Sequence, residues 1–364
     1  MRQEQARLRV GIVGGGIGRA HARGYQALPE RWELTAICDI DQARADAFAD
    51  EFSVPRVVSD LAELCRMDDL DVVDICTPPS LHFEHIQQVL NASKHAICEK
   101  PLVGSLRQVD ELMHAEAASG RRMMPIFQYR FGHGLQKLKC LQQAGVTGDA
   151  YLSTVETAWR RRAEYYAVPW RGKWATELGG AVLSHAIHAH DTLLYVLGPA
   201  RAVFARTRTR VNPIEVEDCA AVALTMADGS LATLAVTLGS VDEITRHRFA
   251  FSGMTAESNT RPYTSSGDPW TFTADRPELE PDIERVLAEF RPLPEGYAGQ
   301  FHRFYDALRA GREPPVTLAD AHRALELVAA IYHSARTDSD VTLPLDPRDE
   351  LYSTWLPSAL TVSR

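Results

Sequence analysis

The first third of the chain alternates short apolar runs with longer amphipathic segments. The runs expected to be strands are Leu8–Val13, Leu34–Cys38, Val72–Cys76, Ala96–Cys98 and Met123–Phe127. Alternation of this kind is typical of βαβ units wound around a parallel sheet. The segment from Ser105 begins with a capping box, since Ser105 and Gln108 stand at the required spacing. The pattern predicts an α/β fold with a doubly wound parallel sheet.

Length and charge limit the possible functions. The 364 residues suggest about two domains, and the end of the alternation divides them into residues 1–127 and 128–364. The formal net charge of −9 offers no basic surface for nucleic acid. The N-terminal sequence MRQEQARLRV lacks the apolar core of a secretory signal, and no stretch approaches the roughly 18 apolar residues of a membrane span. We therefore expect a cytoplasmic protein that binds neither nucleic acid nor membrane.

The six cysteines show no CxxC spacing. Cys38, Cys76 and Cys98 each fall inside an apolar run and are expected to be buried thiols. The cysteines therefore indicate neither disulfides nor a zinc site.

A glycine-rich turn, VGGGIGRAH at residues 13–21, follows the first expected strand. Glycines there let the backbone approach a pyrophosphate, which the N–H groups of the following helix bind. The match to GxGxxG is imperfect, because Arg19 stands at the sixth position and Gly18 comes one place early. The alternative is a tight turn without a ligand. The predicted dinucleotide-binding residues here are Gly14, Gly16, Ile17 and Gly18.

Asp39 ends the second expected strand, 21 residues beyond Gly18. A carboxylate there accepts hydrogen bonds from the adenosine ribose and repels a 2′-phosphate, so NAD is favoured over NADP as cofactor. The alternative for Asp39 is a helix N-cap, a role that Asp41 also suits.

The third strand ends in ICTPPSLHFEH, residues 75–85. Two prolines force a turn at the carboxyl edge of the sheet, where open α/β folds bind ligands. Thr77, Pro78 and His82 are therefore expected to border the cofactor. The alternative for His82 is a surface histidine in the first turn of a helix.

These features occur in one order: the glycine-rich turn, Asp39, TPPSLH, and then EKP at residues 99–101. In this order they resemble the Gfo/Idh/MocA family of nicotinamide-dependent oxidoreductases, and the resemblance extends through HxxD (188–191) to VTLPL (341–345). It implies an N-terminal Rossmann domain and a C-terminal α+β domain with an open, mainly antiparallel sheet. That second domain would hold the substrate and mediate assembly into a homodimer or homotetramer.

Lys100 stands at the carboxyl end of the fourth major strand. From there it points into the crevice of the sheet, where it can donate to a substrate hydroxyl and favour an alkoxide as hydride leaves. Glu99 would hold the lysine or the cofactor. The alternative is an exposed ion pair without a role. By resemblance, Gln128 and Arg130 of the following QYR line the cleft, Gln128 towards the cofactor and Arg130 towards the substrate.

Tryptophans and arginines are concentrated in WRRRAEYYAVPWRGKWATELGG, residues 159–180. Aromatic faces stack on sugar rings, and guanidinium groups donate to hydroxyls or suit an acidic or phosphate-bearing substrate. A strip for single-stranded nucleic acid is disfavoured by the acidic chain, whereas a loop anchored by its tryptophans remains an alternative. The predicted substrate residues are Trp159, Arg160, Trp170, Arg171 and Trp174.

The segment GGAVLSHAIHAHDTLLYVLGP, residues 179–199, has helical periodicity and ends at Gly198-Pro199. One continuous helix would place Ser184, His188, Asp191 and Tyr195 in a stripe, with His185 beside it. We weigh three interpretations: a metal site, a Ser-His-Asp triad, and general acid/base catalysis by His188 oriented by Asp191. The third is favoured, because imidazole titrates near neutral pH and a mid-helix serine lacks an oxyanion site. We predict no metal.

The resemblance also exposes a departure. Sugar and inositol dehydrogenases of the family typically carry an aspartate four residues before the catalytic histidine, where this chain has Ser184. His185 is expected to take over part of that contact with substrate, alongside Ser184 and His188. The identity of the substrate therefore stays open.

The sequence as a whole predicts an NAD-dependent dehydrogenase of a sugar, sugar derivative or cyclitol, with Lys100 and His188 as catalytic residues. Two alternatives stay open: cleavage of glycosides by oxidation, elimination and re-reduction, and a non-catalytic dinucleotide-responsive regulator. The second domain is expected to contain strands near 201–211, 219–226, 231–238 and 247–252, an excursion of unknown role at 258–296, and helices near 298–310 and 318–336.

Overall fold

The computed structural model describes residues 6–357, so the outermost residues of both predicted domains lie outside the described part. The chain divides into two compact units. The first contains the chain up to Phe127 together with Gly296–Ala321, and the second contains Gln128–Glu295 and the chain from His322. The predicted boundary after Phe127 coincides with this division. The prediction that 128–364 forms one continuous domain is wrong for Gly296–Ala321, which returns to the first unit.

The first unit is built on a six-stranded sheet with the order β3-β2-β1-β4-β5-β6. All pairings between these strands are parallel. The strand order reverses between β1 and β4, which is the arrangement that creates a ligand crevice at the carboxyl edge of a doubly wound sheet. The strands are β1 (Leu8–Val13), β2 (Trp32–Cys38), β3 (Val57–Val58), β4 (Val72–Ile75), β5 (His95–Cys98) and β6 (Met123–Pro125).

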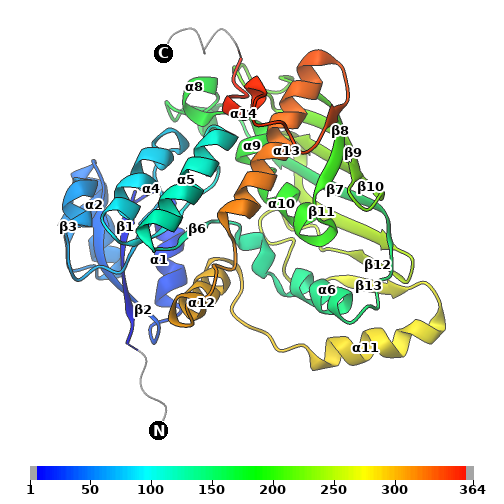
Figure 1. Cartoon of the computed structure of the whole chain (residues 1–364), viewed down its shortest axis with the longest axis horizontal. Helices are drawn as coiled ribbons and strands as arrows, with labels where there is room; N and C mark the ends of the chain where they lie inside the picture. Colours follow the sequence, from blue (N-terminus) through cyan, green and yellow to red (C-terminus); the bar gives the residue numbers. More distant parts are fainter. Residues whose placement is uncertain (1–5, 358–364) are drawn as a thin grey trace. The chain divides into compact units, whose positions relative to one another are not determined.

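Helices connect and flank these strands (Figure 1). Their starts follow local chemistry: Asp41, Asp60 and Ser105 each accept a hydrogen bond from a backbone N–H in the first turn of the helix that follows. The Gln108 side chain accepts from Gly104 N at 3.0 Å, so the predicted helix from Ser105 is present with its reciprocal bond shifted by one residue. The helices are α1 (Gly18–Gln26), α2 (Gln42–Phe52), α3 (Leu61–Cys65), α4 (His82–Asn91), α5 (Leu106–Ser119) and α12 (Gly296–Arg309), with a 3-10 turn η1 (Pro79–Leu81).

Helix α12 explains why Gly296–Ala321 belongs to the first unit. The ring of Phe301 stacks on Tyr25 of α1 at 4.1 Å between centroids, and a Cβ on Gly24 would lie 3.0 Å from that ring. Gln300 also binds the main chain of β6 and its continuation, donating to Pro125 O and accepting from Phe127 N. The sequence predicts a helix near 298–310, but only its partners show where it packs.

The second unit is built on an eight-stranded sheet with the order β13-β12-β11-β7-β10-β9-β8-β14. Among the described strands, β7 and β10 pair in parallel and the other pairings are antiparallel. This confirms the predicted fold class, an α/β sheet plus a mainly antiparallel one. The strands are β7 (Ala150–Arg160), β8 (Ala200–Arg208), β9 (Cys219–Met226), β10 (Leu231–Thr237), β11 (Gly239–Phe251), β12 (Met254–Glu257), β13 (Thr271–Ala274) and β14 (Val341–Thr342).

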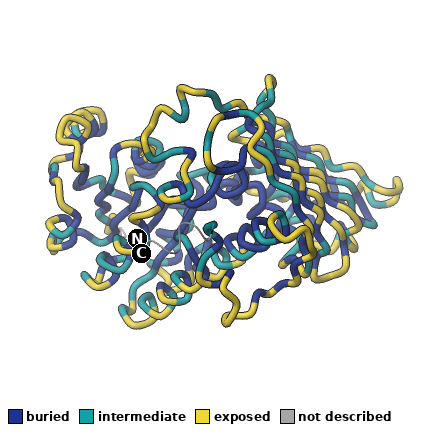
Figure 2. Tube along the Cα trace, turned by 90° about the horizontal axis from the view of Figure 1, so that it is seen from above, coloured by how far each residue is buried: buried dark blue, intermediate teal, exposed yellow. Residues whose placement is uncertain are grey.

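Buried and exposed residues alternate along β9 and β10, so one face of this sheet is covered and the other is open. Figure 2 shows the alternation along the strands. Helices α9 and α10 pack on the covered face. The predicted excursion at 258–296 contains β13, a 3-10 turn η3 (Pro277–Leu279) and α11. The helices are α6 (His133–Gln143), α7 (Ala163–Tyr166), α8 (Trp174–Glu177), α9 (Ala181–Ser184), α10 (Ile187–Leu197), α11 (Glu280–Glu289), α13 (Leu318–Thr337) and α14 (Glu350–Ser353), with a 3-10 turn η2 (Gln128–Phe131).

None of the helices in the described range combines the length and the apolar character that a membrane crossing needs.

Candidate functional site

The glycine-rich turn between β1 and α1 uses each glycine differently. Gly14 has φ of 101°, and a Cβ there would lie 2.6 Å from Cys76 O. A Cβ on Gly18 would lie 2.8 Å from Ile12 Cγ2, so this glycine lets α1 approach β1 closely. A Cβ on Gly16, by contrast, would meet no atom of the described residues within 4 Å. The fold itself requires Gly14 and Gly18, whereas Gly16 leaves open space beside the start of a nine-residue helix, as a bound pyrophosphate needs.

Asp39 follows β2 and is buried. Its Oδ2 accepts a hydrogen bond from Gly15 N at 2.8 Å, and its Oδ1 accepts from Asp41 N at 2.9 Å. Asp41, rather than Asp39, is the N-cap of α2 and accepts from Arg44 N at 3.1 Å. The N-cap alternative for Asp39 is therefore wrong. Its carboxylate ties the glycine-rich turn to the turn after β2.

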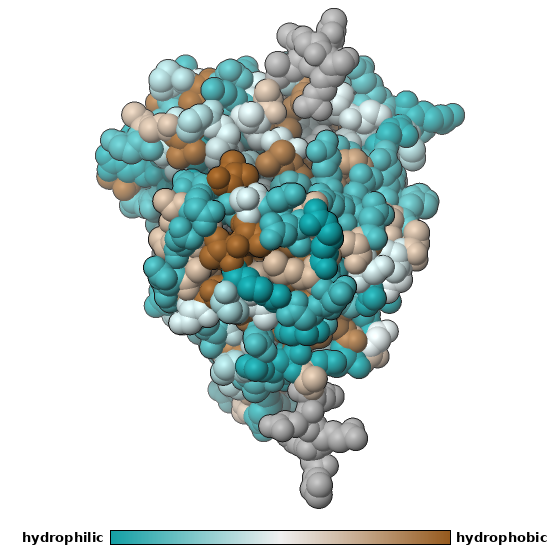
Figure 3. Space-filling view, turned by 90° about the vertical axis from the view of Figure 1, so that its left-hand side faces the viewer, coloured by the Kyte–Doolittle hydropathy of each residue, from teal (hydrophilic) through white to brown (hydrophobic). Residues whose placement is uncertain are grey.

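Exposed apolar side chains stand at three strand-to-helix turns of this sheet. They are Ile17 after β1, Ile40 after β2, which is 93% exposed, and Leu81 after β4. Because the carboxyl ends of parallel strands lie along one edge, these side chains offer an apolar surface at the edge that carries Asp39. Figure 3 shows apolar side chains gathered amid hydrophilic ones on the face of the molecule that carries α2 and β3. Sequence reasoning found only Ile17 of these three, because single exposed apolar residues carry no pattern.

His82, the first residue of α4, is fully buried, so the surface-histidine alternative is wrong. Its Nε2 lies 2.8 Å from Thr77 O and its Nδ1 lies 2.9 Å from Pro101 O. The ring therefore connects the turn after β4 to the turn after β5. Burial lowers the pKa of His82. Thr77 and Pro78 remain half-buried at the turn itself.

Lys100 follows β5 and is half-buried, whereas Glu99 is buried. Glu99 Oε2 accepts a hydrogen bond from the backbone N of Lys100 at 3.0 Å, and Oε1 accepts from the hydroxyl of Tyr297 at 2.9 Å. The adjacent Glu99 and Lys100 are therefore not an exposed ion pair. The Glu99 carboxylate holds the backbone that carries Lys100.

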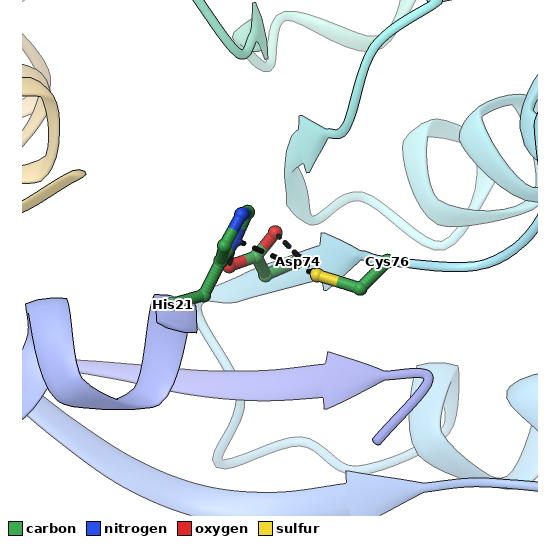
Figure 4. A group of neighbouring side chains, drawn as sticks. All are labelled: His21, Asp74 and Cys76. Atoms are coloured by element: carbon green, nitrogen blue, oxygen red, sulfur yellow. Dashed lines mark hydrogen bonds and ion pairs between the residues drawn. The ribbon is translucent and has the colours of Figure 1, made fainter. Parts of the chain in front are cut away.

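Sequence reasoning missed a histidine beneath this turn. His21, in the first half of α1, is fully buried; its Nε2 lies 3.0 Å from Glu99 Oε1 and its Nδ1 lies 2.8 Å from Asp74 Oδ2. Figure 4 shows His21, Asp74 and Cys76 pointing toward one another from α1 and from β4 and its end. Burial alone would lower the pKa of His21, but the Asp74 carboxylate raises it well above its usual value. The available signal was Asp74, an aspartate inside an otherwise apolar strand.

In the second unit, the predicted continuous helix over 179–199 is wrong. The segment forms α9 and α10 with a break at His185 and Ala186. At the start of α9, the two carboxylate oxygens of Glu217 accept from Gly180 N at 3.1 Å and Val182 N at 2.9 Å. Ser184 therefore ends α9, and the predicted stripe is divided between two helices.

His188 lies in the first turn of α10 and is buried. Its ring stacks on Tyr129, with 4.9 Å between centroids and 23° between planes. Asp191, expected to orient His188, accepts two hydrogen bonds from Arg130, from Nε at 2.8 Å and from Nη2 at 2.6 Å. Arg130 was predicted to contact substrate, but its side chain is only 6% exposed and is paired with Asp191. Gln128, at the start of η2, is half-buried.

The aromatic segment after β7 packs into a cluster rather than forming a row. Trp159 is buried, donates from Nε1 to Thr245 Oγ1 at 2.9 Å, and lies beside His185 with 5.7 Å between ring centroids. Arg160 is exposed at the end of β7. Arg161, which sequence reasoning passed over, lies over the rings of Trp159 and Tyr165, 5.1 Å from each centroid.

The tryptophans farther along this segment are half-buried. Trp174 donates from Nε1 to Glu215 O at 3.1 Å, as the anchoring alternative requires. Arg171 lies over the rings of Tyr165 and Trp170, at 4.0 and 4.4 Å from their centroids. His185, Arg161 and Arg171 thus lie around the ring of Tyr165, and Trp159 contacts His185 and Arg161.

Side chains of types that bind metals lie together in the first unit and not on the helix predicted over 179–199. Among residues 6–357, His21, Asp74 and Cys76 bring three potential ligand atoms within 4.8 Å of one another. His185, His188 and Asp191 do not form such a group in that range.

Comparison with known proteins identifies the family. Residues 8–127 match the model described as an oxidoreductase family with an NAD-binding Rossmann fold, and residues 135–257 match the GFO/IDH/MocA C-terminal domain. The chain belongs to the Gfo/Idh/MocA oxidoreductase family. The resemblance inferred from the glycine-rich turn, Asp39 and EKP is thereby confirmed.

Relatives match over nearly the full length. An uncharacterized oxidoreductase, YrbE of Bacillus subtilis, is 27% identical over 89% of this chain and 93% of its own. The D-glucoside 3-dehydrogenase of Escherichia coli is 27% identical over 92% of this chain and 97% of its own. The crystal structure of the WlbA dehydrogenase from Bordetella pertussis in complex with NADH and UDP-GlcNAcA is 28% identical, with a TM-score of 0.83 over 94% of this chain and all of that chain.

Proposed function

We propose that this protein is an NAD-dependent dehydrogenase that transfers a hydride between a ring carbinol of a sugar, sugar derivative or cyclitol and the nicotinamide. The observation that carries the proposal is Lys100, which follows a central parallel strand while the buried Glu99 carboxylate holds its backbone. A lysine fixed at the carboxyl edge of such a sheet is suited to stabilise a developing alkoxide.

The residues of the first unit fit a dinucleotide. Gly16 leaves room at the start of α1, and Ile17 and Ile40 offer apolar surface for an adenine. The Asp39 carboxylate suits the ribose hydroxyls and would repel a 2′-phosphate, which favours NAD over NADP. Bound NAD would supply the hydride acceptor. Thr77, Pro78 and Gln128 complete the set of proposed cofactor residues.

Two side chains would handle the proton and the charge. His188 would accept the proton of the hydroxyl being oxidised, since imidazole titrates near neutral pH. The Tyr129 ring against which it stacks restricts its orientation. The Lys100 ammonium would stabilise the oxygen as its negative charge develops. Arg130 would act indirectly, by holding Asp191 one turn along α10 from His188.

The substrate class is supported by relatives with named activities. D-glucoside 3-dehydrogenase and the inositol 2-dehydrogenase 2 of Paenarthrobacter aurescens, 26% identical over 92% of this chain, both act on ring hydroxyls by name. The aromatic rings of Trp159 and Tyr165, with the Arg171 guanidinium over the face of Tyr165, suit a polyhydroxylated ring. Trp170, Trp174, Arg160, Ser184 and His185 are the further candidates for substrate contact.

A substrate screen tests the proposal. Sugars, inositols and sugar acids are each incubated with NAD or NADP, and NADH or NADPH formation is followed by absorbance. We expect NADH formation with at least one cyclic polyol, and loss of turnover in Lys100→Met with NAD affinity retained. Full activity in Lys100→Met would refute the role of Lys100. Substrate conversion without net NADH would instead indicate an oxidation, elimination and re-reduction sequence, and tight NAD binding with no conversion across the panel would indicate a regulator.

We also propose that the protein is a homodimer or homotetramer through the open face of the second sheet. On this face Leu152 pairs with Leu231, which is 52% exposed, and Phe204 pairs with Ala223. Charged side chains lie on the same face, since Arg206 pairs with Ala221 and Glu156 pairs with Arg246. An apolar patch bordered by charged residues suits packing against its own copy. Light scattering should give a multiple of 40.4 kDa, and Leu231→Asp should lower it. A monomer for the unmodified protein would refute the proposal.

A further inference from the structure

A buried polar cluster lies beneath the turn that carries Lys100. We call it the His21 cluster; it consists of His21, Tyr25, Asp74, Glu99 and Tyr297. The first four side chains are buried and Tyr297 is half-buried. They come from α1, β4, the end of β5 and α12, so the cluster connects four elements of the first unit. None of these groups except Glu99 has a role in the proposed chemistry.

The contacts of the cluster place acceptors at both ring nitrogens of His21. Glu99 accepts from the Tyr297 hydroxyl and from Lys100 N, and its Oε1 lies 3.0 Å from His21 Nε2. Asp74 Oδ2 likewise accepts from the Tyr25 hydroxyl at 2.7 Å and from His21 Nδ1. A neutral imidazole has one N–H and would direct a lone pair at one of these oxygens. With both carboxylates ionised, both ring nitrogens donate and His21 is an imidazolium, in keeping with a pKa that the Asp74 carboxylate raises against the effect of burial.

We propose that His21 is a positioning residue for the reaction, in which its imidazolium bridges Asp74 and Glu99 and so fixes the carboxylate that holds the Lys100 backbone. The part that concerns Lys100 rests on the proposed function; the charge on His21 does not. The path runs from the ring of His21 to Glu99 Oε1 at 3.0 Å, and from Glu99 Oε2 to Lys100 N, also at 3.0 Å.

The imidazolium of His21 is the only cation among the five members of the cluster. Burial raises the pKa of the Tyr25 hydroxyl and of Tyr297, and it raises the pKa of Cys76 to about 12 and that of Cys98 well above its usual value. These groups stay neutral, so the two carboxylates and the imidazolium sum to one negative charge beside Lys100. Without the imidazolium, two buried carboxylates would face each other, and one of them would bind a proton instead.

A metal ion is the competing occupant, because His21, Asp74 and Cys76 are ligand types within 4.8 Å. Metal binding requires a bare ring nitrogen and a thiolate. Both of the ring nitrogens face carboxylate oxygens here, Nδ1 at 2.8 Å and Nε2 at 3.0 Å. The two occupants predict different states of the His21 ring, so one measurement separates them.

The first experiment reads the charge directly and needs no turnover. Protein with ¹⁵N-labelled histidine is observed by NMR between pH 6 and 9, and the His21 signals are assigned by their loss in His21→Gln. We expect both ring nitrogens to remain protonated across this range, before and after addition of Zn²⁺ and after treatment with a chelator. A single-tautomer neutral ring, or conversion to a metal-bound ring on adding Zn²⁺, would overturn the proposal.

The second experiment separates charge from shape. His21→Gln keeps an amide donor but removes the cation; the double variant His21→Gln, Asp74→Asn also removes one carboxylate and restores the net charge. We expect His21→Gln to lower kcat at least tenfold, to change substrate KM and NAD Kd less than threefold, and to add a pH dependence to kcat between pH 6 and 9. The double variant should recover most of kcat. A purely structural role predicts that both variants lose stability and that the pH profile is unchanged, which would overturn the proposal.

Failure of the proposed function is distinguishable from failure of this inference. If the unmodified protein oxidises no polyol, Lys100 is observed by ¹³C NMR after reductive methylation, because the chain has five lysines and Lys100→Met assigns the signal. We expect His21→Gln to shift the Lys100 signal or its titration, and Tyr25→Phe, which removes a hydrogen bond to Asp74 without changing charge, to shift it less. An unchanged Lys100 signal in His21→Gln would overturn the inference whatever the activity.

Discussion

Two buried histidines in the second unit should lower the free energy of unfolding as the pH falls. The size of this effect follows from their burial. His190 on α10 and His247 on β11 are 1% and 0% exposed. Burial lowers the pKa of His247 to about 4, and burial together with His247 lowers the pKa of His190 to about 3. Both rings are therefore neutral in the folded protein at moderately acidic pH.

The unfolded chain protonates these histidines near their ordinary pKa of about 6.5. Because the folded pKa values are depressed, the stability that they contribute is complete above pH 6.5 and is lost as pH falls towards the folded values. Each histidine costs about 1.4 kcal/mol per pH unit in that window, so a change from pH 7.5 to pH 5.0 removes about 2 kcal/mol for His247 and a similar amount for His190. Glu217, whose pKa is raised by burial to about 7, changes stability in the opposite sense over the same range.

His247→Phe isolates one contribution, because its ring position lies among Phe249 and Trp270 and accepts an aromatic residue. Urea unfolding is followed by tryptophan fluorescence at pH 7.5 and 5.0; five of the six tryptophans lie in the second unit. The loss of unfolding free energy on acidification should be about 2 kcal/mol smaller in the variant than in the unmodified protein. Equal losses in the two proteins would refute a buried, neutral His247.

The Arg130–Asp191 pair and Asp39 give further predictions. Asp191→Ala leaves a buried guanidinium without its carboxylate and should cost about 3–5 kcal/mol in urea unfolding, whereas Arg130→Met with Asp191→Leu should cost less; the reverse order would contradict a buried ion pair. Asp39→Ala should weaken NAD binding more than NADP binding in isothermal titration, because it removes the group that repels a 2′-phosphate. An unchanged ratio of the two Kd values would show that Asp39 does not select the cofactor.

The sequence predicted the first sheet well because buried parallel strands are continuous apolar runs, which are local features. Strand β3 was not predicted, because it has only two residues. The break between α9 and α10 was not predicted, because the apolar periodicity of 179–199 runs through it; the partner of the start of α9, Glu217, also stands more than 30 residues farther along the chain. In the same way, the pattern of 298–310 predicts a helix but not the unit on which it packs.

In the candidate site, too, local features were predicted and contacts between distant elements were not. Lys100 and the glycine-rich turn lie where sequence reasoning placed them, because the carboxyl end of a parallel strand is a position that a motif identifies. The partner of Asp191 and the environment of Glu99 depend on residues from distant elements, as Arg130 and His21 illustrate. Pairing of buried charges is a tertiary property, and a single sequence does not record it.

Asp39 bears on attempts to engineer the cofactor preference of this protein. Its two oxygens already accept the backbone N–H groups of Gly15 and Asp41, so the side chain holds two loops together besides the cofactor selection that we propose for it. Removing it to admit a 2′-phosphate would leave the donor of the glycine-rich turn without its acceptor. A successful redesign would therefore begin by giving Gly15 N a new acceptor and would add a phosphate-binding arginine only afterwards.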